Sequence, residues 1–342
     1  MHKLNNILSF CIYCITAFNI LLNTSVAQQA KFVDSVTALY KKEQKLTEKA
    51  RLAGELSQIY MAIDTLQSDY WGNKALEDAE LSRDRKAMFK AQFDNGLRFS
   101  FVVAKKGYAA KALQYLNIAY NIAKENKLEK EQAEALLWQA HVHRLISEID
   151  KSLSYATQAF AITQSLNNDS LLSASYISFA QCYKEKGDKL LTLKNIFEAT
   201  TLAEKIDNLP LKRACYLQLA DFYFGTKNYD KALDYAFKVL HLDFQSKSEE
   251  SKYGRVTVYN TIGNIYVRKK NYNMAQSFYE TSIKYADTIA FAPLKMQGYM
   301  GLLNMYLSAD EPQKALNFFN NKPDLKQYIS GFGMNSVIDQ AY

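Results

Sequence analysis

Histidine side chains are the first candidates for metal or acid–base chemistry in this 342-residue chain, which has four of them: His2, His141, His143 and His241. Two histidines that hold one metal ion from a single helix need a spacing of about four residues. His141 and His143 are only two positions apart, so a helix would direct their rings to different faces. We therefore expect no metal site here, and we expect His143 to be a packing residue.

Sequence motifs for catalysis and phosphate binding are missing. The chain has no His-Glu-x-x-His, no Gly-x-Ser-x-Gly and no phosphate loop, and Gly331-Phe332-Gly333 lacks the preceding strand of a nucleotide-binding turn. The acidic side chains Glu129, Glu131 and Glu134 have the spacing of a solvated helix face. The sequence thus predicts a protein that is not an enzyme and binds no cofactor. A hydrolase whose catalytic groups converge only on folding is a remote alternative.

The composition indicates which elements would position any functional residues. Hydrophobic residues make up 48% of the chain, whereas there are only 12 glycines and 4 prolines. So few turn-forming residues argue against a β-sandwich, a barrel or a low-complexity linker, and the hydrophobic content argues against general disorder. We expect an all-α fold.

The net charge of +7 is spread along the chain. The densest basic runs are Lys41-Lys42, Lys105-Lys106 and Arg268-Lys269-Lys270, each beside acidic or apolar residues. A nucleic-acid-binding protein usually concentrates its positive charge on one face. Nucleic acid is therefore not an expected partner.

The amino terminus has the three parts of a secretory signal peptide. Lys3 precedes an apolar run over residues 7–22, and the small residues Ser25 and Ala27 follow. We expect residues 1–27 to be a signal peptide and the protein to be exported to the periplasm or cell envelope of a bacterium. An uncleaved membrane anchor is the alternative. Only Cys182 and Cys215 lie beyond this segment, too few for a disulfide framework, so both are expected to be buried.

A two-residue pattern, a large residue usually followed by a small one, recurs along the chain. The pairs begin 40, 40, 40, 43 and 40 residues apart, at Phe99, Gln139, Phe179, Leu219, Ile262 and Leu302. A bulky residue follows four positions later, at Val103, His143, Tyr183, Tyr223, Tyr266 and Tyr306. A small residue comes nine positions after that, at Ala112, Ser152, Thr192, Ala232, Ala275 and Ala315. Such a fixed period is the signature of a repeat architecture.

The pattern predicts that each repeat forms two helices joined by a turn. In one repeat we expect a helix over residues 211–224, a turn over 225–228 and a second helix capped by Asp230. Ala232, Leu233 and Ala236 then share one face of that second helix. A hairpin of this kind cannot bury its apolar surface alone, so neighbouring hairpins must stack.

The residues of these repeats resemble the tetratricopeptide signature. Leu219-Ala220, Tyr223, Tyr229 and Ala232 fill its large-small, aromatic and alanine positions, as do Ile262-Gly263, Tyr266, Tyr272, Ala275 and Tyr279. The family repeat is about 34 residues long, so this chain is more similar to the long-repeat variant of bacterial envelope and signalling proteins. The resemblance implies an α-solenoid, a right-handed superhelix of about six to seven antiparallel hairpins.

The repeat period also suggests a domain organisation. After the signal peptide, residues 28–81 would hold N-terminal helices and a degenerate first repeat with Ala75 in the small-residue position. Residues 82–323 would form the repeat array, and residues 324–342 a C-terminal cap or a truncated repeat. The stretch 243–253 contains the three-residue insertion, and we expect it to be the longest internal loop.

The resemblance places the first helix of each hairpin along a concave groove. The groove would be lined by residues two positions before and two after each large residue. The earlier row is Leu97, Leu137, Ile177, Leu217, Asn260 and Met300, and the later row is Phe101, His141, Gln181, Asp221, Asn264 and Asn304. The groove would thus be aliphatic toward the amino end and rich in amides toward the carboxyl end.

The densest polar part of this predicted groove contains Asn260, Asn264 and Arg268, with Gln297 and Asn304 from the next repeat. An amide side chain carries both a donor and an acceptor, which suits the main chain of an extended peptide. We hypothesise that this patch holds a peptide, and the alternative is a hydrated inner wall. No lysine accompanies the asparagines, so we do not expect it to clamp a peptide carboxylate.

These observations favour an exported, non-enzymatic scaffold that binds a protein or peptide partner, a membrane-associated one included. The alternative is the envelope-side sensory region of a signal-transduction protein that lacks its membrane span and output domain. The sequence leaves open the identity of the partner or signal, the oligomeric state, and whether the chain is complete at Tyr342.

Overall fold

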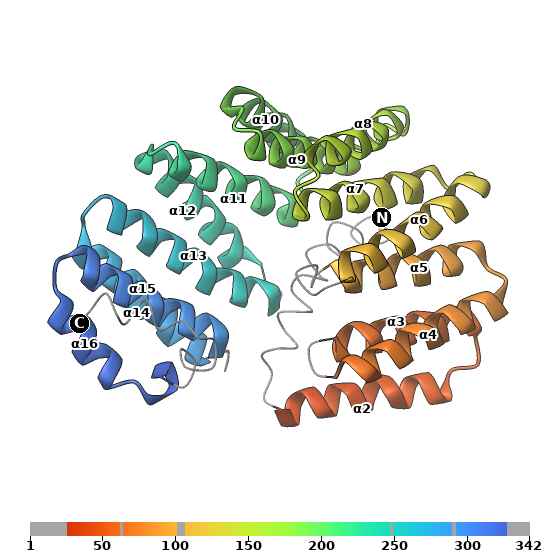
Figure 1. Ribbon diagram of the computed structural model, residues 1–342, viewed down its shortest axis with the longest axis horizontal. Coiled ribbons are helices and arrows are strands. Elements are labelled where there is room, and N and C mark those ends of the chain that lie inside the picture. Colours follow the sequence, from red (N-terminus) through yellow and green to blue (C-terminus); the bar gives the residue numbers. More distant parts are fainter. Residues whose placement is uncertain (1–25, 62–63, 101–106, 247–248, 289–291, 327–342) are drawn as a thin grey trace. The chain divides into compact units, whose positions relative to one another are not determined.

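The structure is a computed structural model that describes residues 26–61, 64–100, 107–246, 249–288 and 292–326 (Figure 1). These residues form helices and no strand, which confirms the all-α prediction. The helices are α2 (Val26–Lys42), α3 (Leu46–Tyr60), α4 (Thr65–Ser82), α5 (Arg85–Ser100), α6 (Tyr108–Glu125), α7 (Glu129–Leu145), α8 (Ile149–Ser165), α9 (Asp169–Glu185), α10 (Lys189–Lys205), α11 (Leu209–Gly225), α12 (Tyr229–Gln245), α13 (Glu249–Arg268), α14 (Tyr272–Thr288), α15 (Ala292–Ser308) and α16 (Pro312–Asn320).

The helices form two compact units that divide within α11. Unit 1 contains residues 26–215 and unit 2 contains residues 216–326 of the described chain. The division falls inside the range predicted as one repeat array. Each unit is described separately below.

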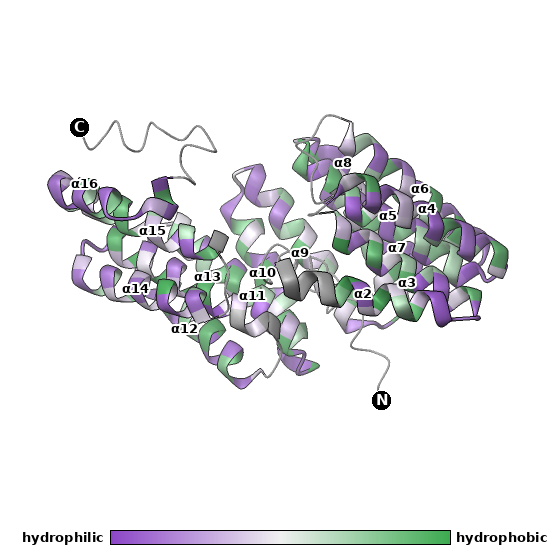
Figure 2. Cartoon of the chain, turned by 90° about the horizontal axis from the view of Figure 1, so that it is seen from below, coloured by the Kyte–Doolittle hydropathy of each residue, from purple (hydrophilic) through white to green (hydrophobic). Residues whose placement is uncertain are grey.

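Within each unit, consecutive helices pack as hairpins that stack on one another. In unit 1, α3 packs with α4, α5 with α6, α7 with α8 and α9 with α10. The first helix of a hairpin also contacts the first helix of its neighbour, as α3 does α5 and as α13 does α15 in unit 2. Figure 2 shows hydrophobic and hydrophilic residues mixed along the helices, as stacked amphipathic helices require. This is the layered packing of a helical-repeat solenoid.

The backbone repeats with the same period as the sequence. In the six hairpins from α5–α6 to α15–α16, the described turn between the two helices has one residue with a positive φ, and these residues are Gly107, Ser147, Gly187, Lys227, Lys270 and Asp310. Their spacing is again 40, 40, 40, 43 and 40. A left-handed residue at this point ends the first helix and reverses the chain. The predicted repeat is therefore present in the backbone as well as in the side chains.

The small residues of the repeat are buried where the two helices of a hairpin meet. Ala112, Ser152, Thr192, Ala232, Ala275 and Ala315 are all at most 2% exposed. In the first hairpin, however, the equivalent residue is Ser68 and not Ala75. Ser68 lies three residues after the start of α4, as Ser152 does in α8. The hydroxyl of Ser68 donates a 2.7 Å hydrogen bond to the carbonyl of Ser57, whereas Ala75 is buried two turns further along α4.

The cap predicted for α12 was wrong. Asn228, not Asp230, is the N-cap, because its side-chain oxygen accepts a hydrogen bond from the amide of Lys231 at 3.3 Å. Asp230 is already the second residue of the helix, and its carboxylate pairs instead with Lys269 of the next hairpin.

The loop predicted at residues 243–253 was also wrong. Helix α12 continues to Gln245 and α13 begins at Glu249, so only residues 246–248 lie between them. Helix α13 is 20 residues long, compared with 17 for α11. The inserted residues therefore lengthen a helix, where their backbone groups are hydrogen bonded, and they do not lengthen a loop.

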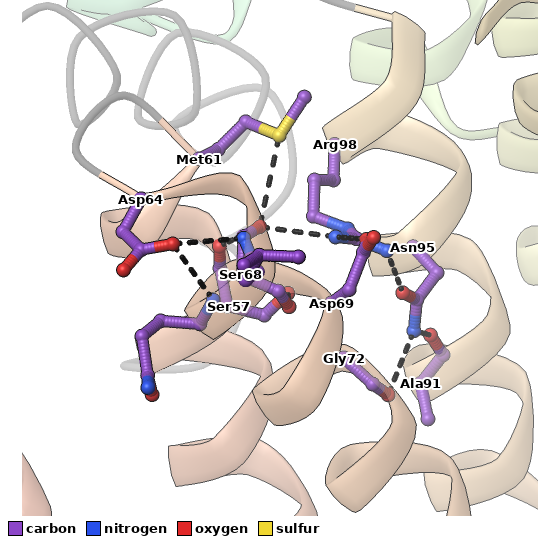
Figure 3. A network of polar contacts seen from close by, with 11 residues as sticks. Ser57, Met61, Asp64, Ser68, Asp69, Gly72, Ala91, Asn95 and Arg98 are labelled. Atoms are coloured by element: carbon purple, nitrogen blue, oxygen red, sulfur yellow. Dashed lines mark hydrogen bonds and ion pairs between the residues drawn. The ribbon is translucent and has the colours of Figure 1, made fainter.

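Unit 1 contains a buried polar network at the contact of α4 with α5 (Figure 3). Arg98 is 3% exposed, and its guanidinium donates to Ser68 Oγ at 3.0 Å, Asp69 Oδ1 at 2.6 Å and Asn95 Oδ1 at 3.0 Å. Asn95 in turn donates to the carbonyl of Gly72 at 3.2 Å. A buried guanidinium is tolerated only with such partners, so this network fixes the position of α5 against α4.

Several sequence predictions concern single residues or the amino terminus. Cys182 and Cys215 are buried and form no disulfide, as expected. His143 is 7% exposed and stacks on Tyr155 with ring centroids 5.0 Å apart, so its predicted packing role is confirmed. Residues 1–25 of the predicted signal peptide lie outside the described residues. Among the residues that are described, no helix combines the length and the apolar content needed to cross a membrane.

Candidate partner-binding surface

The polar patch predicted from the sequence lies on α13 and α15, the first helices of two hairpins in unit 2 that contact each other. Asn260, Asn264 and Arg268 are four residues apart on α13, so they share one face of the helix. Asn264 and Arg268 are exposed, as are Gln297 and Asn304 on α15, whereas Asn260 is buried. We call these five residues the amide patch.

The side chain of Tyr279, on α14, packs against both helices that carry the amide patch. Its side chain is 1% exposed. A Cβ atom at Gly263 on α13 would lie 2.7 Å from the tyrosine ring, and one at Gly301 on α15 would lie 2.3 Å from it. Both distances are far below van der Waals contact, so the two glycines are what allow the ring to fit against α13 and α15.

The hydroxyl of Tyr279 also orients one amide of the patch. It donates a 2.7 Å hydrogen bond to Oδ1 of Asn264. This fixes the amide plane and turns the Nδ2 donors of Asn264 away from the tyrosine. Burial raises the pKa of Tyr279 well above its ordinary value, so the hydroxyl keeps its proton and remains a donor. The repeat signature accounts for a tyrosine at this position, but the sequence did not predict its positioning role.

Asn260 is a buried amide without hydrogen-bond partners. It is 7% exposed, and neither Oδ1 nor Nδ2 makes a hydrogen bond. Its Oδ1 faces Gly298 of α15, where an added Cβ would lie 3.6 Å away. An unsatisfied buried polar group costs about 1–3 kcal/mol, so such a residue in a native structure needs an explanation. Both atoms are buried, so only a ligand that reaches between α13 and α15 could supply the missing donor and acceptor.

The remaining members of the later row do not form a second patch. Phe101 lies outside the described residues, Gln181 and His141 are partly buried in unit 1, and Asp221 is exposed in unit 2. His141 Nδ1 lies 3.3 Å from the guanidinium of Arg144. Burial, together with the charge of Arg144, lowers the pKa of His141 to about 4, so this ring is neutral near pH 7.

The earlier row differs from the prediction at Leu97. This residue is fully buried in a core cluster with Phe93 and Leu116, so it does not line any surface. Leu137, Ile177, Leu217 and Met300 are partly buried, and Ile177 packs against Ala199 and Cys215. Core packing thus takes up much of the predicted aliphatic lining.

One acidic residue was misassigned from the sequence. Glu134, expected on a solvated face with Glu129 and Glu131, is 6% exposed in the structure. One sequence feature that sets Glu134 apart was missed. A lysine lies four residues before Glu134, and the same lysine–acid spacing occurs 40 positions upstream at Asp94. Within the described part of the chain, no group of three or more His, Cys, Asp or Glu side chains is arranged to hold a metal ion.

Comparison with known proteins shows relatives by structure only. No family model matches the sequence, and no curated protein matches it. Solved structures do match. BtubC (BKLC) from P. vanneervenii has a TM-score of 0.54 and 16% identity, over 68% of this chain and 92% of that chain.

Two further structures with similar folds are a signalling ATPase and a Rap protein. The STAND protein with a tetratricopeptide repeat sensor, PH0952 from Pyrococcus horikoshii, has a TM-score of 0.58 and 15% identity, over 86% of this chain but 46% of that chain. The Rap protein in complex with Competence and Sporulation Factor has a TM-score of 0.54 and 13% identity, over 82% and 81%. Identities this low show the fold alone. The chain has the fold of a tetratricopeptide-type helical-repeat protein.

Proposed function

We propose that this protein is a non-enzymatic scaffold that binds a protein or peptide partner through the amide patch of α13 and α15. The observation that carries the proposal is the unpartnered Asn260 amide. An extended peptide offers an N–H and a C=O at every residue, which would match the acceptor and the donor of Asn260 once the side chains that cover them move aside. The exposed side chains of Asn264 and Asn304 add further amide donors and acceptors beside it.

Similar structures support a binding role without identifying the ligand. The Rap protein was solved in complex with Competence and Sporulation Factor, and the STAND protein carries its repeats as a sensor. The STAND protein also favours the alternative function, a sensory region of a signalling protein. Both functions require a ligand on the repeats, so the amide patch is the site to test in either case.

Asn260→Leu tests the proposal most directly. Leucine is apolar and similar in size to asparagine, so the buried site loses its unsatisfied polar atoms. We expect the free energy of unfolding to stay the same or rise, while binding of peptides selected from a random displayed library is lost. A variant that binds these peptides as well as the natural protein does would contradict the proposal.

A double variant tests the exposed part of the patch. Asn264→Ala with Asn304→Ala should weaken binding of the same peptides at least tenfold while helicity is preserved. The matched control is Asn273→Ala, which removes an exposed asparagine from α14, outside the patch. Equal affinities for the double variant and the control would show that the patch is only a hydrated wall.

Export is a separate part of the proposal. We infer from the amino-terminal sequence that the protein is secreted across the inner membrane and cleaved after Ala27. Mass spectrometry of the protein from a bacterial envelope fraction should find a mature chain that begins at Gln28. A chain that retains residues 1–27 would favour the anchored form.

A further inference from the structure

Two successive first helices of unit 1 carry the same pair of charged residues at equivalent positions. Lys90 and Asp94 lie on α5, and Lys130 and Glu134 lie 40 residues later on α7. Helices α5 and α7 contact each other. The structure therefore allows a direct comparison of two equivalent lysine–acid pairs.

The first pair is closed and the second is open. Asp94 is 7% exposed, and the ammonium of Lys90 donates a hydrogen bond to its Oδ1. Glu134 is 6% exposed, but its buried Oε1 makes no hydrogen bond. The ammonium of Lys130 lies 4.0 Å from this oxygen, beyond hydrogen-bond distance.

The open pair leaves Glu134 in an unfavourable state. The buried Oε1 loses its hydration without gaining a hydrogen bond, which disfavours the ionised carboxylate despite the attraction of nearby lysines. Burial accordingly raises the pKa of Glu134 to about 7, an effect that Glu131 adds to and that Lys130 and Lys90 oppose. A ligand that brings a positively charged donor to Oε1 would stabilise the ionised form.

We propose that Glu134 is the recognition residue for an arginine side chain of a partner peptide, bound against α5 and α7 of unit 1. A guanidinium presents two parallel N–H donors that match both oxygens of a carboxylate. The single ammonium of Lys130 lacks this geometry and lies 4.0 Å from Oε1, and because Oε1 is buried the ligand must displace this lysine. Its side chain is 39% exposed, so it can turn into solvent as the ligand enters. This site does not depend on the amide patch of unit 2, and either can fail alone.

The experiment uses N-acetyl-arginine amide, in which the guanidinium is the only charge, and the citrulline analogue as a neutral probe of similar shape. Binding is followed by NMR of the full chain, from the shifts of backbone amides in α5 and α7 and of the Glu134 carboxyl carbon. We expect saturable shifts with the arginine probe and at least tenfold weaker binding of the citrulline probe.

Two variants separate the site from general charge effects. Glu134→Gln should raise the Kd of the arginine probe at least tenfold. Glu131→Gln removes the same charge from the same turn of α7, where Glu131 lies 3.9 Å from Lys86, and should change the Kd less than twofold. Equal Kd values for the two variants would overturn the proposal.

The pH dependence of binding to the unmodified protein tests the charge of the ligand without any variant. A cationic ligand prefers ionised Glu134, so its affinity should rise from about pH 6 to about pH 8 and the carboxyl pKa should fall on binding. A carbonyl ligand would need the protonated acid and show the opposite trend. An affinity that falls with pH, equal binding of the citrulline probe, or no saturable shift with the arginine probe would each overturn the proposal.

Discussion

The hydroxyl of Tyr279, on α14, donates a 2.7 Å hydrogen bond to the side-chain oxygen of Asn264, on α13. One partner is almost fully buried and the other is exposed. A residue of the hairpin core therefore sets the direction of an amide at the surface. This contact links the stability of unit 2 to the geometry of the proposed peptide site.

Removing this hydroxyl should weaken binding and folding by similar free energies. Tyr279→Phe keeps the ring between Gly263 and Gly301 but releases the Asn264 amide. We expect peptide affinity to fall about fivefold and the free energy of unfolding to fall by about 1 kcal/mol. Calorimetric titration and urea unfolding measure the two quantities.

Tyr272→Phe is the matched control for this variant. The hydroxyl of Tyr272 donates a 2.6 Å hydrogen bond to the carbonyl of Ser308, not to an amide of the patch. It should lower stability by a similar amount and leave affinity unchanged. Loss of affinity in both variants would mean that Asn264 is not specifically oriented by Tyr279.

Two glycines of unit 2 should respond in opposite ways to alanine. A Cβ at Gly301 would lie 2.3 Å from the ring of Tyr279, so Gly301→Ala should destabilise unit 2 by about 1–3 kcal/mol. A Cβ at Gly225, the last residue of α11, has no atom within 4 Å. Gly225→Ala should therefore stabilise the helix by roughly 0.5 kcal/mol. Urea unfolding of the two variants checks both signs, and a stable Gly301→Ala would show that Tyr279 can move aside.

Backbone conformation alone should determine which residues are tolerated at position 187, in the turn between α9 and α10. The φ of Gly187 is +78°, and a Cβ added at this position would have no atom within 4 Å. Gly187→Ala should cost about 1–2 kcal/mol, because alanine is strained in the left-handed region. Gly187→Asn should cost less, since asparagine tolerates that region. Thermal unfolding compares them, and equal losses would point to a side-chain clash.

Glu134 should make stability depend on pH. Its pKa is about 7 in the folded protein, above its ordinary value of 4.5, so the folded state binds more protons than the unfolded state. This favours folding below pH 4.5, and the advantage is lost as pH rises through 7. Glu134→Gln lacks this dependence. As the pH rises from 4.5 to 7, the free energy of unfolding of the variant should increase by roughly 2–3 kcal/mol relative to that of the natural protein. Above this range the difference should stay constant.

Chemical unfolding across this pH range measures the effect. Glu131→Gln serves as the control, since it removes a neighbouring charge from the same helix. A constant difference between Glu134→Gln and the natural protein at all pH values would show that Glu134 is hydrated in the folded state.

Local sequence information was sufficient for the helices and their period. Ala232 and Ala275 could be placed at helix contacts from the sequence, because only a small side chain lets two helices approach closely. The turns followed from the same count, although of the six turn residues with a positive φ only Gly107 and Gly187 are glycines. At Ser147 and Lys227 the repeat position, not the side chain, indicated the turn.

Predictions that required knowledge of neighbouring residues were less successful. Asp230 has the right chemistry for a helix cap, but Asn228 is closer to the helix start. Ala75 has the right size for the small-residue position, but the start of α4 gives that position to Ser68. Both errors arose because a shift of a few residues in a helix boundary changes which side chain meets which neighbour.

The 40-residue period and the positions of small residues were enough to predict a stack of helical hairpins. Both can be identified in the sequence without knowing which side chains meet in the folded chain. The burial of Glu134 and the missing hydrogen-bond partners of Asn260 became apparent only in the folded chain. Whether a polar atom is buried, and whether it finds a donor, depends on side chains from an adjacent hairpin 40 residues away. The lysine–acid spacing at Asp94 and Glu134 is visible in the sequence, but it does not reveal that Glu134 is buried or that Asn260 lacks a partner, and the proposed binding sites depend on both.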